Sequence, residues 1–203
     1  TGFVLDDYLK DNEFFGGDIV VISSASSKTS FSLAFLLNEG RQRKVVGLTS
    51  AANQAFVEGM GIYDEVVTYD DIKSLDAGRK AAFIDMAGND KVTASIHHHF
   101  GDNCVCSAGV GITHWEARDG NGSDVLPGAK RAMFFAPDQI QKRNREWGPE
   151  VYQQKMNDAW ERFLGSVDDW VTLKYFEGAE SMQQAYAEVL KGASPDSGYV
   201  VVV

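Results

Sequence analysis

Short apolar runs alternate with longer segments of helical periodicity along most of this chain. The runs have the length of buried strands, and we expect strands at about residues 19–23, 44–50, 64–70, 79–88, 103–111 and 131–137. The segments between them predict helices at about residues 28–38, 51–61 and 89–101, after a short amphipathic helix at residues 3–10. Strands that alternate with helices are typical of parallel βαβ units. The pattern therefore predicts an α/β fold, a doubly wound parallel sheet with helices on both faces.

Two later parts of the chain depart from this alternation. Residues 112–130 are rich in Gly and Asp and have no periodicity, so we expect a long loop there. Residues 137–167 predict a helix that breaks at Gly148 and Pro149, and one face of its second part carries Tyr152, Met156, Trp160 and Phe163. Such a face is most simply core or subunit contact. A strand at about residues 170–176, a helix at about 179–191 and a valine strand at 200–203 complete the pattern.

Composition excludes several classes of partner. Hydrophobic residues make up 44% and charged residues 24% of the chain, as in ordinary globular proteins. The formal net charge of −10 argues against nucleic acid, because phosphate backbones require a basic surface. The sequence has no apolar run long enough to span a bilayer, so we expect no membrane partner. Cys104 and Cys106 would share one face of a strand and are too close for a good disulfide, so we expect reduced thiols and a cytoplasmic location.

The segment from Asp18 to Leu37 carries the most chemistry. An apolar strand meets a turn of small polar residues, and a helix follows, which is how α/β proteins present backbone N–H groups and a helix dipole to a phosphate. Where a dinucleotide-binding turn has three glycines, this chain has Ser24, Ser27 and Ser30. Serine restricts the backbone more than glycine does, but its hydroxyl can face a phosphate oxygen. The side chain of Lys28 adds a local positive charge to this Rossmann-type turn.

Two other interpretations of the turn remain open. It could be a polar strand–helix turn that binds nothing. Alternatively, Ser27, Lys28 and Thr29 match the end of a nucleotide triphosphate P-loop, and residues 82–86 resemble its acidic strand. A P-loop needs glycine at both ends, and here Ile22 occupies the first of those positions.

The residues at the end of the second predicted strand distinguish an NAD site from an NADP site. NAD sites usually carry an acidic residue there for the ribose 2′-hydroxyl, but residues 47–53 contain none. Thr49, Ser50 and Asn53 could instead hold a 2′-phosphate. The cations Arg41, Arg43 and Lys44 lie just upstream, although Arg41 and Arg43 could simply form a solvated turn. We therefore expect NADP(H) rather than NAD.

With these residues considered, the chain resembles the cofactor half of the medium-chain dehydrogenase/reductase superfamily, quinone-oxidoreductase type. Residues 47–72 resemble its second strand, helix and third strand, residues 81–90 its fourth strand and turn, and residues 176–203 its closing helix and strand. The motifs SSASSKT, FIDMAG and VGITHWE together resemble a branch known only as a domain of unknown function. The resemblance covers nearly the whole chain.

The resemblance implies a division of the chain into two parts. Residues 1–169 would form an NADP-binding Rossmann-like domain, and the strand–helix–strand of residues 170–203 would complete an N-terminal substrate domain that is missing from this sequence. The sequence starts at Thr1 rather than Met, so we expect it to begin inside a longer gene product. In related enzymes the sixth strand forms a dimer edge, and we expect a homodimer through residues 132–136.

The resemblance also assigns cofactor contacts at the adenosine end. The diphosphate would contact the turn, whose residues are Ser24, Ala25, Ser26, Ser27, Lys28 and Thr29. The adenosine ribose would lie against Ser50 and Asn53, and the adenine beside Tyr69. All these residues follow the carboxyl ends of predicted strands, where open α/β sheets bind ligands.

The nicotinamide end of the cofactor would meet the fourth and fifth strands. Its ribose would pass Met86, Ala87 and Gly88, and its ring would be bordered by Ser107, Ala108 and Gly109. Asp85, at the end of the fourth strand, is either a polar ligand contact or a turn and helix-capping residue.

Two candidate sites lie outside this path. His97, His98 and His99, followed by the two cysteines, suggest zinc, but successive helix residues lie about 100° apart around the axis, so at most one or two of the three could converge on a metal. A solvated helix end beside core cysteines is the simpler interpretation, and we expect no metal. His114 follows the fifth strand and is a candidate proton donor, although a loop anchored by Trp115 explains the same residues.

The sequence thus predicts an NADP(H)-binding domain of a zinc-independent oxidoreductase. The reaction would be hydride transfer from the nicotinamide to a carbonyl or an activated alkene of a small-molecule substrate. The alternative is a non-catalytic nucleotide-binding or scaffolding domain that kept the fold and lost cofactor binding with the glycines.

Overall fold

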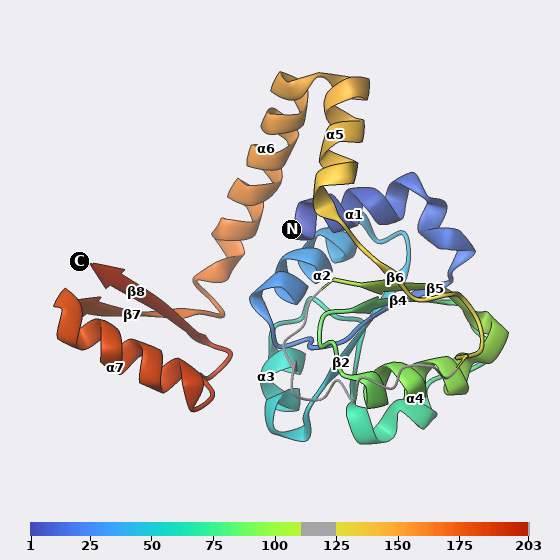
Figure 1. Cartoon of the computed structure of the whole chain (residues 1–203), viewed down its shortest axis with the longest axis horizontal. Coiled ribbons are helices and arrows are strands. Elements are labelled where there is room, and N and C mark those ends of the chain that lie inside the picture. Colours follow the sequence, from blue (N-terminus) through green and yellow to red (C-terminus); the bar gives the residue numbers. More distant parts are fainter. Residues whose placement is uncertain (111–124, 203) are drawn as a thin grey trace.

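The computed structural model describes residues 1–110 and 125–202. Six parallel strands form one sheet in the order β3-β2-β1-β4-β5-β6 (Figure 1). They are β1 (Ile19–Ile22), β2 (Lys44–Thr49), β3 (Glu65–Thr68), β4 (Ala81–Asp85), β5 (Cys104–Gly109) and β6 (Ala132–Met133). The strand order reverses between β1 and β4, and their carboxyl ends define the switch point where such sheets bind ligands. The predicted Rossmann-type doubly wound sheet is confirmed.

Helices cover both faces of this sheet, which explains why its central strands are apolar throughout. The helices α1 (Gly2–Asp11), α2 (Lys28–Gly40) and α3 (Gln54–Gly59) bury one core. The helix α4 (Asp90–Phe100) and the 3₁₀ segment Tyr69–Ser74 bury the other. Every residue of β1 and β4 is buried. These two strands hold the switch point rigidly between the two helical layers.

The close packing of α1 on α2 depends on Gly2. A Cβ atom at Gly2 would lie 2.2 Å from Ser32 Oγ, so no larger residue fits between the two helices.

Three local features differ from the sequence-based expectation. The backbone takes left-handed φ angles at Glu13, Phe14 and Phe15, before the expected turn at Gly16 and Gly17. The strand β6 has two residues rather than seven, because α5 begins at Ala136 with a proline in its first turn.

No helix within the described ranges is long and apolar enough to cross a membrane.

The two cysteines are the third difference, because we expected them to share one face of a strand. A register shift where β5 begins pairs Ala81 with Cys104 and Ala82 with Cys106. The bulge reverses the alternation, so Cys104 packs in the α4 core and Cys106 in the α2 core. Both thiols are free, and burial raises the pKa of Cys104 to about 11 and of Cys106 to about 12. The thiols are therefore neutral at physiological pH, and they do not share a face.

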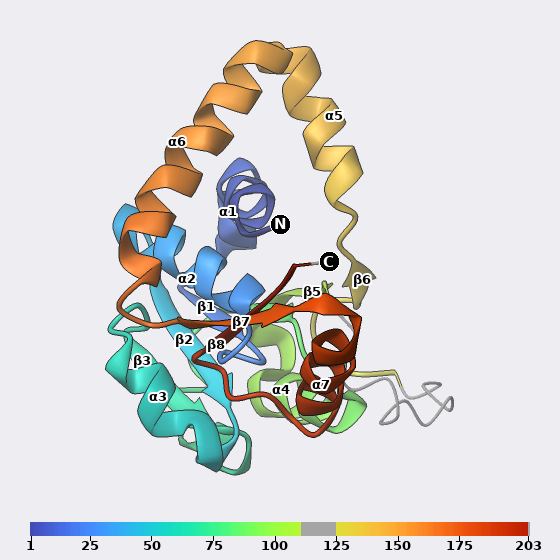
Figure 2. The same ribbon diagram turned by 90° about the vertical axis from the view of Figure 1, so that its left-hand side faces the viewer.

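The helices α5 (Ala136–Trp147) and α6 (Pro149–Val167) form a hairpin that rises beside α1 (Figure 2). The predicted break lies at Gly148, whose φ of 83° a side chain would resist. Arg143 of α5 binds Asp7 and Asp11 of α1, which fixes the first arm. On the expected apolar face of α6, Tyr152 is buried, but Trp160 remains 56% exposed. That face is therefore only partly covered within the described residues.

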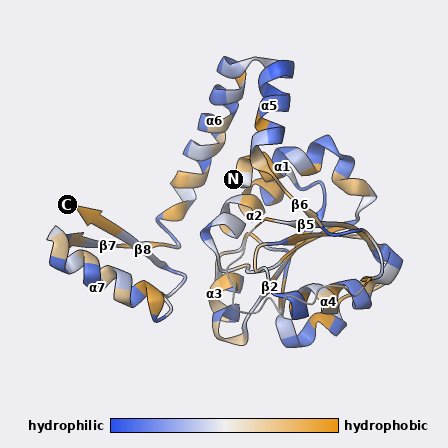
Figure 3. Cartoon of the chain, in the orientation of Figure 1, coloured by the Kyte–Doolittle hydropathy of each residue, from blue (hydrophilic) through white to orange (hydrophobic). Residues whose placement is uncertain are grey.

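The C-terminal residues form a unit of their own, which we call the C-terminal unit. It consists of β7 (Thr172–Glu177), α7 (Gly178–Leu190) and β8 (Ser197–Val202), and its two strands pair in parallel and separately from the main sheet. The unit lies apart from the main body in Figure 1, and Figure 3 shows apolar residues along β8 and at one end of α7. Trp170, just before β7, packs against Phe35 and Phe163 and anchors the unit at its start.

Candidate functional site

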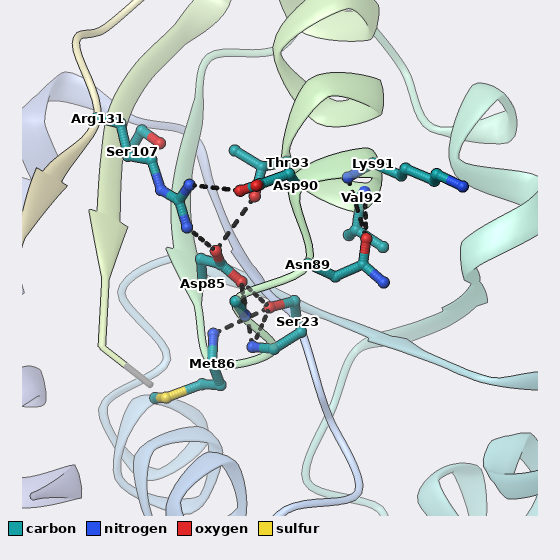
Figure 4. Close-up of polar contacts among 12 residues, drawn as sticks. Ser23, Asp85, Met86, Asn89, Asp90, Lys91, Val92, Thr93, Ser107 and Arg131 are labelled. Carbon is teal, nitrogen blue, oxygen red and sulfur yellow. Dashed lines mark hydrogen bonds and ion pairs between the residues drawn. The ribbon is translucent and has the colours of Figure 1, made fainter. Parts of the chain in front are cut away.

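A buried polar network ties the switch point together (Figure 4). The Asp85 side chain, 1% exposed, ends β4, and its Oδ1 accepts hydrogen bonds from Ser23 Oγ at 2.8 Å and from the amides of Ala87 and Gly88. Its Oδ2 accepts from Thr93 Oγ1 at 3.1 Å and from Arg131 Nη2 at 2.9 Å. Of the two roles proposed for Asp85, the structure shows the turn role, because both oxygens are occupied by the protein itself.

Sequence reasoning missed Ser23 and Arg131 in this network. Ser23 directly follows β1, and its hydroxyl also accepts from the amides of Met86 and Ala87. The neighbouring positions of β1 and β4 in a 3-2-1-4-5-6 sheet could have indicated this contact. Arg131 bridges Asp85 and Asp90 at 2.9 and 3.0 Å from just before β6, and nothing in its local sequence predicts that reach.

The three serines that replace glycines take three different roles. Ser24 adopts the left-handed φ of 52° that glycine would accept without strain. Ser27 is the N-cap of α2, and its Oγ accepts from the Ser30 amide at 3.2 Å. Ser30 is fully buried in the first helical turn and donates to the Ser23 carbonyl at 3.3 Å. A small residue at that position lets α2 approach β1 closely.

The amides of the turn divide into occupied and available groups. The Ser24 amide donates to the Tyr69 hydroxyl at 2.9 Å, and the Ala25 amide to the Leu48 carbonyl at 2.9 Å. The amides of Ser26, Lys28 and Thr29 have no hydrogen-bond partner among the described residues. They stand at the N-terminus of a long helix, where the dipole favours an anion. Three amides of the turn can therefore receive a phosphate, whereas Ser24 and Ala25 are engaged.

The side chain of Tyr69 contacts the turn directly. Its hydroxyl caps the Ser24 amide, and burial raises the pKa of this phenol. Asn53 also reaches the turn, since its Nδ2 donates to Ser26 Oγ at 3.1 Å. Ser50 lies partly exposed at the end of β2, beside the short 3₁₀ segment Ala51–Asn53. Tyr69 and Asn53 therefore border one side of the turn.

The cations upstream of β2 do not belong to this edge. Lys44 begins β2 and pairs with Glu65 at 2.6 Å, while Arg43 donates to the Gly17 carbonyl and lies over the Phe14 ring. Arg41 caps the C-terminus of α2. These side chains lie at the amino edge of the sheet, one strand length away from the carboxyl ends. Of the two interpretations of residues 41–44, the structure supports the solvated turn.

At the other end of the proposed cofactor path, the side chains are largely enclosed. Met86, Ala87 and Gly88 are buried, and their amides bind Ser23 and Asp85. Ala108 and Gly109 lie buried at the end of β5.

Ser107 is also buried at the end of β5, where its hydroxyl lies 2.8 Å from His97 Nε2. The other ring nitrogen of His97 lies 2.8 Å from the Pro127 carbonyl and must donate to it. With Nδ1 as the donor, Nε2 can accept from the Ser107 hydroxyl, and this contact turns the Ser107 side chain into the core.

This contact corrects the view of the histidines as a solvated helix end. His97 is fully buried, His98 is exposed, and His99 binds the Leu75 carbonyl at 2.8 Å. The three rings point in different directions, as successive helix positions require. Among the described residues, no group of three potential ligands is placed to hold a metal ion. His114 and Trp115 lie outside the described residues.

Lys28 is the first residue of α2, directly after the turn. Its ammonium donates to the carbonyls of Pro195 at 2.9 Å and Ser197 at 2.8 Å, so the C-terminal unit contacts the first residue of α2. Partial burial lowers the pKa of Lys28.

Sheet order, switch point and turn define this molecule as a Rossmann-type α/β domain. Residues 1–195 match the family described as a protein of unknown function (DUF2855), and the chain belongs to this family. No protein with a curated description matches the chain significantly.

Solved structures share the fold at low sequence identity. A candidate NADPH:quinone reductase from Mesorhizobium loti is 13% identical with a TM-score of 0.67, over 100% of this chain and 57% of that one. The YhdH oxidoreductase from Salmonella enterica, in complex with NADP, is 15% identical with a TM-score of 0.60, over 100% and 60%. YhdH from E. coli K-12 with bound NADPH is 17% identical with a TM-score of 0.57, over 98% and 60%. This chain spans less than two thirds of the length of each.

Proposed function

We propose that this chain is the NADP(H)-binding domain of a zinc-independent oxidoreductase in the medium-chain dehydrogenase/reductase superfamily, quinone-oxidoreductase type. The nicotinamide would deliver a hydride to a carbonyl or an activated alkene. The observation that carries the proposal is the group of amides at Ser26, Lys28 and Thr29, which have no partner in the described part of the chain and lie at the switch point of a 3-2-1-4-5-6 sheet. The likeness to reductases solved with NADP or NADPH supports the choice of cofactor.

The assigned contacts follow from the position of these amides. A diphosphate at the turn would place the adenosine toward Ser50, Asn53 and Tyr69, and the nicotinamide toward residues 86–88 and 107–109. Because the side chains of Asp85 and Ser107 are engaged in the protein, we propose that these last segments contribute shape and backbone groups rather than free side-chain donors.

The proposal includes the role of the C-terminal unit as one edge of a substrate domain. Large apolar side chains lie exposed on it, among them Leu173 at 52%, Tyr175 at 67% and Leu190 at 69%. Exposed apolar surface of this extent is typical of an interface. The partner we propose is the remainder of the substrate domain, from residues outside this sequence. A homodimer through β6, the exposed edge strand, belongs to the same proposal.

A fluorescence titration of the chain with NADPH tests the proposal. Ser26→Asp keeps an acceptor for Asn53 but adds a negative charge beside the proposed phosphate, and Ser26→Asn is its neutral control. We expect saturable binding by the unmodified chain and by Ser26→Asn. We expect at least a roughly tenfold weaker affinity for Ser26→Asp, because like charges in contact cost several kcal/mol.

The same titration separates the two candidate functions. Absence of saturable binding at millimolar NADPH would support the scaffolding domain, which the strained Ser24 and its Tyr69 contact would suit. Binding of NADPH at least as tight as NADH would support the choice of NADP(H).

A further inference from the structure

Lys28 joins two parts of the chain that are otherwise nearly separate. The elements of the C-terminal unit pack chiefly on one another, and Trp170 anchors only the entry to β7. The far end of the unit is held by the Lys28 ammonium, which donates to the carbonyls of Pro195 and Ser197, 167 and 169 residues away. Ser197 is the first residue of β8. This contact therefore fixes where β8 starts relative to the turn.

The same lysine carries one of the available amides of the turn. Lys28 is the first residue of α2, and side chains of a helix lean toward its N-terminus. An ammonium has three N–H donors, and two of those on Lys28 bind the carbonyls. Among the described residues the third has no partner. This third N–H is the donor left for an anion at the amides of Ser26 and Thr29.

The electrostatics of this lysine favour such an anion. Burial lowers its pKa, because the charge has lost water and gained only neutral carbonyl acceptors. The nearby Asp196 opposes this effect, but its carboxylate is bound by Ser194 and Ser197. A phosphate against the turn would supply a negatively charged hydrogen-bond acceptor, which the two carbonyls do not provide.

We propose that Lys28 couples the binding of a phosphate or diphosphate at the turn to the docking of the C-terminal unit. The anion and residues 195–197 share one ammonium, so each stabilises the other, and by linkage the docked unit raises the affinity for the anion. The proposal rests on the proposed function where the anion is the diphosphate of NADP(H). Inorganic pyrophosphate has the same chemistry and provides a separate probe.

Amide hydrogen exchange of the full chain, followed by mass spectrometry, tests this coupling at β8. The chain is measured alone, with NADPH and with pyrophosphate, in the unmodified form, as Lys28→Ala and as Lys91→Ala. Lys91 is a matched control, because it also lies in the first turn of a helix at the carboxyl edge and its side chain points away from the network in Figure 4. Exchange in β1 and β4 reports whether each variant is folded.

We expect either anion to slow exchange in β8 severalfold in the unmodified chain and in Lys91→Ala. Lys28→Ala should exchange roughly tenfold faster in β8 without ligand, because two charge-assisted hydrogen bonds are lost. It should also lose the response to either anion, with unchanged exchange in β1 and β4.

The outcomes separate the coupling from the cofactor. Protection by pyrophosphate without NADPH binding supports the coupling and overturns the proposed function. Saturable NADPH binding with unchanged or faster exchange in β8 overturns the coupling alone. Failure of both anions to bind overturns both proposals.

Discussion

The stability of the switch point depends on the charge of Asp85, and Asp85→Asn tests this most directly. The carboxylate is 1% exposed and accepts five hydrogen bonds. An asparagine oxygen can keep the bonds to Ser23 and the turn amides, and its NH2 group can donate to Thr93. That NH2 group and the Arg131 guanidinium are both hydrogen-bond donors, so they cannot bond to each other. The ion pair between Arg131 and the buried residue 85 is therefore lost.

The magnitude follows from the burial of the pair. Removing one partner of a fully buried pair costs about 3–5 kcal/mol. The Arg131 side chain is 28% exposed and keeps Asp90, so part of this cost is recovered through water and the second carboxylate. We expect Asp85→Asn to lower the free energy of unfolding by about 2–3 kcal/mol. For a chain of this size, that corresponds to a fall in Tm of roughly 5–10 °C.

Urea unfolding, monitored by tryptophan fluorescence, measures this loss. Asp90→Asn is the matched control, because it removes the other carboxylate on the same guanidinium at a side chain that is 36% exposed. It should cost about 1 kcal/mol or less. Adding Arg131→Met to Asp85→Asn should cost little more, since the pair is already broken. Equal losses for the two asparagine variants would refute the assigned role of Asp85.

Three further predictions concern other parts of the chain. Ser24→Gly should raise the free energy of unfolding by about 0.5–1 kcal/mol by relieving the left-handed φ, whereas Ser30→Gly should lower it by about 1–2 kcal/mol within α2, and the reverse order in urea unfolding would contradict these roles. Burial raises the pKa of Asp6 above its ordinary value of 3.8, so the folded chain binds the carboxyl proton more tightly than the unfolded chain does. The contribution of Asp6 to the free energy of unfolding therefore falls as the pH rises from the unfolded pKa through the folded pKa. Asp6→Asn should remove this slope from urea unfolding measured across the acidic range, and an unchanged slope would assign it to another group. Sedimentation equilibrium should show a dimer that Ala132→Lys, at the edge strand, converts to monomer, and a monomeric unmodified chain would exclude this interface.

Local pattern was sufficient for the elements and the turn. The apolar runs identify the strands of the main sheet, because a strand covered on both faces has no polar alternation. Gly148 and Pro149 mark the break between α5 and α6. Glycine accepts backbone angles that other residues resist, and proline lacks the N–H that would continue the preceding helix, so both effects can be read from the residue type alone. The turn at residues 23–29 was also located correctly, because strand ends and helix caps are encoded by adjacent residues.

The sequence pattern did not predict which side chains of β5 and α4 face the core. The bulge at the start of β5 separates Cys104 and Cys106, although two positions apart in a regular strand share a face. The burial of His97 arises because α4 turns that one position toward β5, while its neighbours face solvent or the chain near Leu75. A triplet of identical residues carries no information about which member faces inward.

The sequence by itself determined the fold class, the position of the strand–helix turn and the residue types that line it. Only the tertiary structure decided which of those groups are free. The Tyr69 hydroxyl accepts from the Ser24 amide, 45 residues away in the sequence, and Arg131 pairs with Asp85, 46 residues away. Lys28 donates to the Ser197 carbonyl, 169 residues away. Periodicity and capping depend on neighbours within one or two helical turns, whereas a hydrogen bond between distant segments exists only once the strand order has brought them together.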